Sequence, residues 1–498
     1  MIAGNEALGD WRTLPEALGH DLFHFSSTRA SPYWRPVVTL SYYVDHAVGG
    51  GSPWSFHLSN LLFLVVAAGG IARLVAGRIG QAAALALALL FVAHPIQSEG
   101  ASNIAGRTDL LTCVFAVWSM VAAASPRARP GAIFALTALA CGSKEIGVFV
   151  PAAVWLMGGR WRPAALAVGV FLAARAGVLM GLELLPADRP QPSGESAFGA
   201  ASLTWWYLGR LLIPSHLAPA LSLASPTGLA AVAGWVGVVA AGLGALWARR
   251  RAPLAAAGLA LMVLPLLPAS GLARSSLRYG ETFLVLPLAG ACLAVAGLVA
   301  LGPAVAARAP AVLAGLALAA AAVGFGRGTD WASERALWEG AHERLPADAA
   351  VAQNLARVIV SDSPDRALVL LEGASSEDER IERELWEIRA RAYQIRGQSG
   401  PMIAALTRAA APDAEAYWAT ATLCVMVAGQ GAAAVRPCQW ALSVTDSDPA
   451  VWDAAGIALA IAGDLEGAVR HFERAAALAP DDPDIAAHLA AAREDAGQ

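Results

Sequence analysis

The chain has 498 residues, of which 57% are hydrophobic and 15% are charged, and its formal net charge is -4. This composition, with a mean hydropathy of +0.52, excludes an ordinary water-soluble globular protein. No basic cluster with interleaved aromatic residues is present, which argues against a nucleic-acid partner. We therefore expect a protein that lies in a lipid bilayer.

Residues 1–52 form a polar and aromatic segment ahead of the first apolar stretch. We expect this segment to hold interfacial helices on the extracytoplasmic side. It contains no basic region followed by an apolar run, so nothing in it would start its own export. The sequence therefore predicts that an upstream helix is missing. The alternative is that Phe56 to Leu74 acts as a reverse signal anchor.

Residues 53–328 contain many stretches that approach about 20 apolar residues, the length that crosses a bilayer core of roughly 30 Å. Backbone polar groups must be satisfied within lipid, and alternating strand patterns are absent, so each span should be a helix. We predict an all-α fold, in which a polytopic transmembrane bundle (residues 53–328) is followed by a helical repeat domain (residues 329–498).

Arginines in short connections are typical of the cytoplasmic side of a membrane protein. They recur at Arg73, Arg78, Arg127, Arg129, Arg160, Arg162, Arg249, Arg250, Arg251 and Arg308. Threading the chain through them predicts ten crossings, with Leu203 to Ile213 as a re-entrant or interfacial segment. Because ten is even, both ends share one side, and this side is extracytoplasmic because the last span leaves from the cytoplasmic Arg308. In a bacterial inner membrane, the repeats would then lie in the periplasm.

The loop near residue 100 is the first dense polar patch at a predicted membrane edge. Here His94, Glu99 and Arg107 supply an imidazole, a carboxylate and a guanidinium, and Asp109 follows. Ionisable groups at membrane depth are costly, so each is a functional candidate. The alternative is an ordinary connecting loop.

The hairpin Ala132 to Met157 is too short for two full spans, so its apex should lie below the membrane surface. That apex is Ser143-Lys144-Glu145, and Lys144 is the only lysine in the chain. We expect Lys144 and Glu145 to bind a lipid phosphate or the substrate, because an unpaired ammonium would be expensive there. The alternative is a satisfied internal ion pair.

Two further polar patches are predicted on the same side. One opens a late span and consists of Arg274, Arg278, Tyr279, Gly280 and Glu281. The other contains Arg35 within an aromatic stretch that ends at His57, and such aromatic residues are also typical of an interfacial belt.

A period of about 34 residues in the last third of the chain predicts tetratricopeptide repeats (TPRs). In Pro449 to Asp482, the characteristic positions are Trp452, Gly456, Gly463, Ala468, Phe472, Ala475 and Pro480. A matching unit and two weaker ones precede it, and a linking helix is expected at Ser333 to Arg344. The concave TPR surface would bind a protein or peptide partner, or the array would serve as a spacer.

The five cysteines fall into two groups. Cys113, Cys141 and Cys292 lie in apolar spans and are expected to be small buried side chains. Cys424 and Cys438 lie on consecutive predicted repeat helices, where a disulfide is feasible if that region is extracytoplasmic.

Several motifs occur in the order seen in one enzyme family. They are Asp10-Trp11-Arg12, Tyr33-Trp34-Arg35-Pro36, Pro53-Trp54-Ser55-Phe56-His57-Leu58, His94-Pro95-x-x-x-Glu99, Ile104-Ala105-Gly106-Arg107-x-Asp109-Leu110, Ser143-Lys144-Glu145 and Glu281 to Pro287. With the TPR array, they make the chain resemble the transmembrane-and-TPR O-mannosyltransferases and their bacterial relatives. The resemblance implies a GT-C glycosyltransferase fold. It also implies transfer of a mannose-like sugar from a polyprenyl-phosphate carrier to a hydroxyl, often of a protein Ser or Thr, on the extracytoplasmic face.

The chain departs from that family at two places. The family's first transmembrane helix and the acidic pair after it have no counterpart before Asn5. Thr282 stands where a basic residue is usual after the glutamate that Glu281 matches. On the resemblance, the principal base would be the absent upstream carboxylate, so this chain alone would be inactive.

Such a transfer needs a carboxylate that takes the acceptor's proton and cations that stabilise the departing lipid phosphate. The expected phosphate- or substrate-binding residues are Arg35, Arg107, Lys144, Glu145, Arg278 and Glu281. Glu99 and His94 would support the acceptor or a divalent metal, whose requirement is left open. This interpretation requires Glu99, Arg107 and Lys144 to meet in one pocket.

Two other functions fit parts of the sequence. A non-catalytic anchor would use its TPR surface to assemble an envelope complex, but it has no reason to place charges at membrane depth on one side. A transporter of lipid-linked sugars would need polar groups along a path to the cytoplasmic side. Almost none lie between the arginine anchors.

Overall fold

The computed structural model divides into two compact units, Met1–Leu337 and Trp338–Gln498. It describes residues 2, 5–22, 33–182, 194–215, 217–221, 226–268, 270, 280–376, 379–411 and 416–497, without the side chains of residues 194–198. Helices make up the ordered elements throughout these ranges, which contain no strand. The predicted all-α fold is confirmed.

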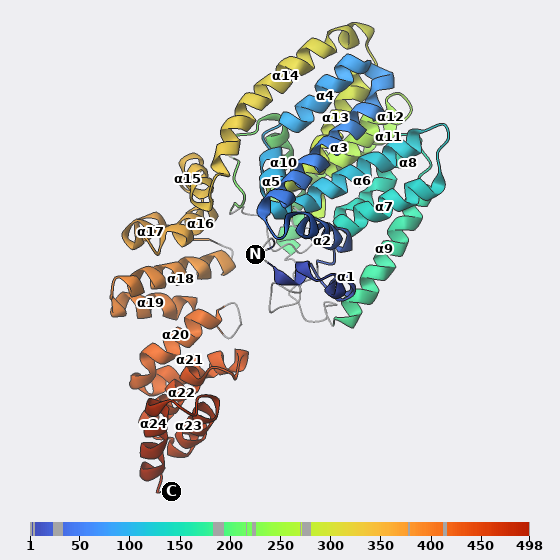
Figure 1. Ribbon diagram of the computed structural model, residues 1–498. Helices are drawn as coiled ribbons and strands as arrows, with labels where there is room; N and C mark the ends of the chain where they lie inside the picture. The colour runs from blue at the N-terminus through green and yellow to red at the C-terminus, as the bar shows by residue number, and fades with distance from the viewer. Residues whose placement is uncertain are drawn as a thin grey trace. The chain divides into compact units, whose positions relative to one another are not determined.

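Apolar helices of the first unit form a bundle (Figure 1). They are α3 (Pro53–Ile79), α4 (Gln81–Ala93), α6 (Arg107–Ala124), α7 (Pro130–Ser143), α8 (Val150–Leu156), α9 (Arg162–Gly181), α11 (Gly228–Ala248), α12 (Pro253–Val263), α13 (Val285–Val299) and α14 (Pro303–Asp330). Shorter or connecting elements are η1 (Glu6–Gly9), η2 (Trp11–Thr13), α1 (Leu14–Gly19), α2 (Pro36–Gly49), α5 (Gln97–Ser102), η3 (Ile104–Gly106), η4 (Glu145–Phe149), α10 (Gly194–Leu212) and η6 (Glu281–Leu284).

Six helices in this unit are long and apolar enough to cross a membrane, which makes the protein an integral membrane protein. Four shorter apolar helices accompany them, at Gln81–Ala93, Pro130–Ser143, Glu145–Leu156 and Pro253–Val263. Among the described residues, the six long and four short helices together equal the ten predicted crossings in number. Helix α10, which holds most of the predicted re-entrant segment, is not among them. Whether each shorter helix crosses the bilayer stays a prediction.

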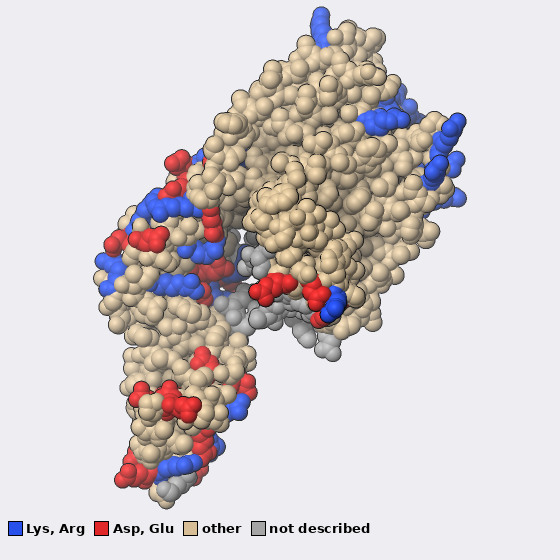
Figure 2. All heavy atoms as spheres, viewed as in Figure 1, with Lys and Arg blue, Asp and Glu red and all other residues tan. Residues whose placement is uncertain are grey.

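Basic atoms on the visible face of the bundle gather at the end that carries the α13–α14 and α11–α12 connections (Figure 2). Acidic atoms on that face lie at the opposite end, near α1. This distribution agrees with the arginines that the sequence places in short connections between spans. The side of the membrane that each end faces stays a prediction.

Helices α12 and α13 touch through their backbones because glycine removes the side chains between them. A Cβ atom at Gly290 would lie 2.7 Å from the carbonyl oxygen of Gly258. Added Cβ atoms at Gly258 and Gly297 would overlap the backbone of the opposite helix, at Ala294 and Ala255. Small residues allow this close approach in a membrane, where packing replaces the hydrophobic effect.

The second unit is a stack of helix pairs. Its elements are the end of α15 (Glu334–Arg344), α16 (Ala349–Ile359), α17 (Pro364–Leu371), α18 (Glu379–Ile395), α19 (Ser399–Ala409), α20 (Tyr417–Val427), η7 (Ala428–Gln430), α21 (Ala432–Val444), α22 (Pro449–Ala462), α23 (Leu465–Leu478) and α24 (Pro483–Asp495). Gly456 lets α22 meet α23, because a Cβ there would lie 2.6 Å from the Phe472 ring. This contact agrees with the TPR unit predicted at Pro449 to Asp482.

The cysteines behave as the sequence suggested. Cys424 on α20 and Cys438 on α21 form a disulfide. Cys113, Cys141 and Cys292 are buried free thiols.

Candidate active site

Lys144 lies at the break between α7 and η4, as predicted for the apex of a short hairpin. Its backbone is extended, with φ of -159° and ψ of 146°. Gly147 then lets η4 fold back on α7, since a Cβ there would lie 2.6 Å from the backbone of Ala140. The lysine side chain thereby turns toward α6.

The partner of Lys144 is Asp109 of α6, and not the adjacent Glu145. The Lys144 Nζ donates to both carboxylate oxygens of Asp109 at 2.7 Å. It also lies 4.5 Å from the centre of the Phe283 ring. The two charged side chains are only 10% and 2% exposed, so neither reaches bulk water. The ion pair foreseen for Lys144 exists, but it joins two distant segments.

Glu145 instead binds two arginines. Its carboxylate accepts from Arg35 at 3.1 Å and from Arg175 at 2.8 Å. The exposed fractions of the side chains are 12% for Arg35, 18% for Arg175 and 31% for Glu145, so this group is the more open one. Arg175 is not among the site residues predicted from the sequence. An arginine in the middle of the apolar stretch that becomes α9 was the available signal.

On the other side of Lys144 lies a buried group of carboxylates. Glu99 on α5 accepts from the backbone N–H of Thr282 at 3.0 Å. Glu281 binds Arg327 of α14 at 2.6 Å, and Arg327 also pairs with Asp330. This contact comes from the backbone of Thr282, so it does not depend on the Thr282 side chain.

Burial raises the pKa of Glu99 to about 8, and the negative charge of Glu281 adds to this effect. The N–H of Thr282 favours the ionised form, but it does not offset the loss of water. Asp109 also acts on Glu99 electrostatically, which joins the carboxylates to the Lys144 pair. The surroundings of Glu99 therefore favour its protonated form.

These groups form two clusters, which are linked along the chain by the adjacent residues Lys144 and Glu145 and which we together call the charged row. It consists of Arg175, Arg35, Glu145, Lys144, Asp109, Glu99, Glu281 and Arg327. Lys144 stands between a basic group that is partly open and an acidic group that is buried. An arrangement of this kind can hold an anion at one end and exchange a proton at the other.

Arg107 does not belong to the charged row, which corrects the expectation that it meets Glu99 and Lys144. Its guanidinium is fully buried. It donates to Asn60, Ser41, Ser59 and the Phe56 carbonyl at 2.7–3.1 Å, and it pairs with Asp45. These partners lie on α2 and α3, so Arg107 of α6 links the three helices. Its guanidinium is engaged within the fold.

His94 is also occupied within the fold. Its Nε2 lies 3.2 Å from the carbonyl oxygen of Leu211, at the end of α10, and its Nδ1 faces the N–H of Ile96 at 3.4 Å. Burial lowers the pKa of His94, so the ring is neutral at physiological pH. It ties the α4–α5 connection to α10. The predicted site residue Arg278 lies outside the described residues, as does Arg274.

Gln97 is the buried polar residue without a partner in this region. It lies two residues before Glu99 on α5 and is 2% exposed. Neither its amide nitrogen nor its amide oxygen has a hydrogen-bond partner in the described part of the chain. Buried amides are normally satisfied, so Gln97 is a candidate for contact with a polar ligand.

No three His, Cys, Asp or Glu side chains among the described residues lie close enough to hold a metal ion together. These residues therefore do not provide a ligand set for the divalent metal left open by the sequence.

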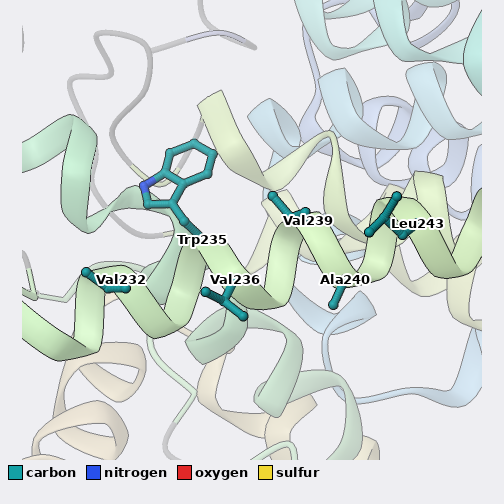
Figure 3. A pocket seen from close by; sticks show the side chains of 6 residues that line it. All are labelled: Val232, Trp235, Val236, Val239, Ala240 and Leu243. Carbon is teal, nitrogen blue, oxygen red and sulfur yellow. The ribbon is translucent and has the colours of Figure 1, made fainter.

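A separate groove of about 490 Å³ runs along α11. Its lining residues all come from this one helix, as Figure 3 shows, and they are Val232, Trp235, Val236, Val239, Ala240 and Leu243. Such a surface suits lipid chains and offers no group for proton transfer. It is distinct from the charged row.

Comparison with known proteins gives one family match and several partial relatives. The tetratricopeptide repeat family matches residues 449–492. Protein O-mannosyl-transferase Tmtc2 of Drosophila melanogaster is 41% identical over 83 residues, which are 16% of this chain and 9% of that protein. Protein O-mannosyl-transferase TMTC2 of Mus musculus is 36% identical over 89 residues, 18% of this chain and 11% of that protein.

This chain resembles the TPR-bearing protein O-mannosyl-transferases. Protein O-mannosyl-transferase TMTC4 of Homo sapiens is 28% identical over a longer stretch of 137 residues, 24% of this chain and 18% of that protein. The chain thus matches between 9% and 18% of the length of these curated relatives. The resemblance to O-mannosyltransferases that the sequence motifs indicated is confirmed, over part of the chain.

Proposed function

We propose that this chain is a membrane glycosyltransferase with a GT-C-like bundle. It would move a mannose-like sugar from a polyprenyl-phosphate carrier to a hydroxyl of a protein Ser or Thr on the extracytoplasmic face. The observation that carries the proposal is the charged row, which sets basic and acidic groups on either side of one lysine. The partial similarity to protein O-mannosyl-transferases supports it.

The basic end of the row would hold the lipid phosphate. Arg35 and Arg175 place two guanidinium groups around the Glu145 carboxylate at the more open end of the row. Guanidinium groups bind phosphate oxygens through paired N–H donors. Lys144, next in the row, would stabilise the charge that grows on the phosphate as the sugar leaves.

The acidic end would act on the acceptor. In the transfer, the acceptor oxygen bonds to the anomeric carbon while the bond from that carbon to the phosphate oxygen breaks. The lipid phosphate departs with the electron pair, and the hydroxyl proton passes to a carboxylate. Among the described carboxylates, we assign to Glu99, when ionised, a supporting part in this step on the acceptor side.

No step is assigned to a metal ion, because the described residues offer no ligand set for one. His94 is assigned a structural part, since both of its ring nitrogens face backbone groups. Glu281 acts through its pairing with Arg327, which holds η6 and hence the N–H that binds Glu99.

The TPR unit would bind the acceptor protein or a partner outside the cytoplasm. The Cys424–Cys438 disulfide supports an oxidising compartment, such as the periplasm beyond a bacterial inner membrane. A disulfide of this kind does not persist among cytosolic thiols.

Transfer from a radiolabelled mannosyl-phosphoryl-polyprenol to a Ser/Thr-rich protein acceptor would test this function. The protein is purified in detergent through a C-terminal tag introduced at its native locus. We expect Lys144→Met to lower the transfer rate by about a hundredfold, since one charge-stabilising donor is lost. Arg175→Gln should mainly raise the donor KM, because it removes one of two cations at the more open end.

Arg129→Gln is the matched control, since Arg129 lies at the α6–α7 connection, outside the charged row, and should leave transfer unchanged. Melting curves verify that each variant is folded. Folded wild-type protein that transfers no sugar from any polyprenyl-phosphate donor would overturn the proposal and leave the scaffold function. Equal rates for wild type and folded Arg175→Gln at limiting donor would remove the phosphate assignment.

A further inference from the structure

Gln97 is a buried amide that the fold leaves without a partner. It lies on α5 and is 2% exposed. Its side-chain nitrogen and oxygen are both buried, and neither has a hydrogen-bond partner in the described part of the chain. Such an amide destabilises the folded state, because the hydrogen bonds that it makes with water in the unfolded chain are not replaced. A ligand that supplies these hydrogen bonds would offset the loss.

Asn60 on α3 shows how the fold satisfies a buried amide beside the same helix. Its nitrogen donates to the carbonyl oxygens of Gly100 at 3.2 Å and of Asn103 at 3.0 Å. Its oxygen accepts from Arg107 at 3.1 Å. Asn60 is fully buried, and both ends of its amide are therefore used within the protein. Packing around α5 thus satisfies one amide and leaves the other, Gln97, open.

The position of Gln97 places it beside the charged row. Glu99 follows two residues later on α5 and accepts from the N–H of Thr282. Positions two apart on an α-helix have Cα atoms roughly 5.4 Å from each other, and their side chains point to different sides. A ligand that reaches both residues would therefore present different groups to Gln97 and to Glu99.

Among the ligands of the proposed transfer, the donor sugar suits this amide best. An amide offers N–H donors and a carbonyl acceptor side by side, whereas an ammonium or a guanidinium only donates. Two neighbouring hydroxyls of a sugar ring can accept from the first and donate to the second at the same time. An ionised phosphate cannot donate, and a lone Ser or Thr hydroxyl would leave part of the amide unpaired.

We propose that Gln97 binds two neighbouring hydroxyls of the donor sugar. This assignment rests on the proposed glycosyl transfer for the choice of ligand, and it adds a residue that recognises the sugar. Gln97 would neither take a proton nor stabilise charge. Its role would be to distinguish the sugar-bearing lipid from the bare lipid phosphate.

Thermal melting with two lipids tests the proposal. The full-length, detergent-purified protein is melted with a mannosyl-phosphoryl-polyprenol, with the matching polyprenyl phosphate, and without lipid. A ligand that binds the folded state raises the melting temperature, and more so when it binds more tightly. We expect the sugar-bearing lipid to stabilise the wild type more than the bare lipid does. In Gln97→Met most of this difference should disappear, which corresponds to about tenfold weaker binding of the sugar-bearing lipid.

The melting temperature without lipid gives a second readout. Methionine is unbranched like glutamine but has no amide. Gln97→Met should therefore be at least as stable as the wild type, because it removes polar atoms that the fold does not satisfy. Gln353→Met is the matched control, since Gln353 is also buried but donates to Glu384. It should lower the melting temperature and leave the difference between the two lipids unchanged.

Three results would overturn the proposal. One is a wild type that both lipids stabilise equally. Another is a Gln97→Met protein of lower stability whose lipid difference is intact, because Gln97 would then serve the fold. The third is a higher KM for the protein acceptor in Gln97→Met with an unchanged lipid difference, which would assign the residue to the acceptor.

These melting experiments measure binding, so their outcome is separate from that of the transfer assay. A protein that shows the lipid difference, loses it in Gln97→Met and transfers no sugar would keep the binding role of Gln97 and lose the enzyme. A protein that transfers sugar without showing the lipid difference would lose only the role of Gln97.

Discussion

At the residue scale, Arg107 shows that a buried charge with many partners is structural. We expect Arg107→Met to leave Asp45 uncompensated and to cost about 3–5 kcal/mol of folding free energy. The double variant Arg107→Met/Asp45→Asn should regain part of that loss, because the stranded carboxylate is neutralised. Thermal melting of the detergent-purified proteins measures both. Unchanged stability in Arg107→Met, with loss of sugar transfer alone, would return this residue to the active site.

Glu99 should make the stability of the protein depend on pH. Its pKa rises from 4.5 to about 8 on folding, so between these values the folded protein keeps a proton that the unfolded chain releases. Stability from this group is therefore highest below about pH 4.5 and declines until about pH 8. Melting temperatures at about pH 5 and about pH 8 should differ less in Glu99→Gln than in the wild type. Identical differences would contradict the raised pKa.

At the scale of the elements, the α12–α13 contact depends on the absence of side chains. Gly290→Leu should push the helices apart, because the added atoms would meet the Gly258 carbonyl and the backbone near Met262. A loss of about 2–4 kcal/mol is expected, as for overpacking and lost close contact. Gly242→Leu on α11 is the control, since a Cβ there has nothing within 4 Å. Equal melting temperatures for the two variants would show that this contact is not tight.

The short hairpin of α7 and α8 shows how an element can be predicted without its partners. Its length and its single lysine place a charge at a buried apex, which the structure confirms. The choice of Asp109 for Lys144, and of Arg35 and Arg175 for Glu145, depends on which helices lie alongside. Neighbours in sequence point in different directions at a helix break, so adjacency misleads there.

At the scale of the whole molecule, the predicted topology places the TPR unit and the α6–α7 connection on opposite sides of the membrane. Thr407→Cys on α19 and Gly131→Cys at the start of α7 introduce thiols at exposed positions. A maleimide that cannot cross membranes should label the first, and not the second, in intact spheroplasts. Both should be labelled after detergent permeabilisation, and the native free cysteines should react with neither treatment because they are buried. The reverse pattern would invert the topology.

The sequence by itself determined the class of the protein. Apolar stretches of membrane-spanning length and the repeat period with its glycines depend on local composition and spacing, which a chain carries without folding. The same holds for the candidate residues Glu99 and Lys144, which are conspicuous because charge is scarce near lipid. The sequence left the pairing of Cys424 with Cys438 open, and the structure shows it.

Only the tertiary structure decided how the charges are paired. It assigned Arg107 to Asp45, brought Arg175 to Glu145, and set Glu99 against Thr282 across 183 positions of the chain. The physical reason is that a buried ion takes whichever counter-ion the packed helices bring within a few ångströms, and this proximity is a property of packing, whereas sequence spacing fixes only the face on which a side chain lies.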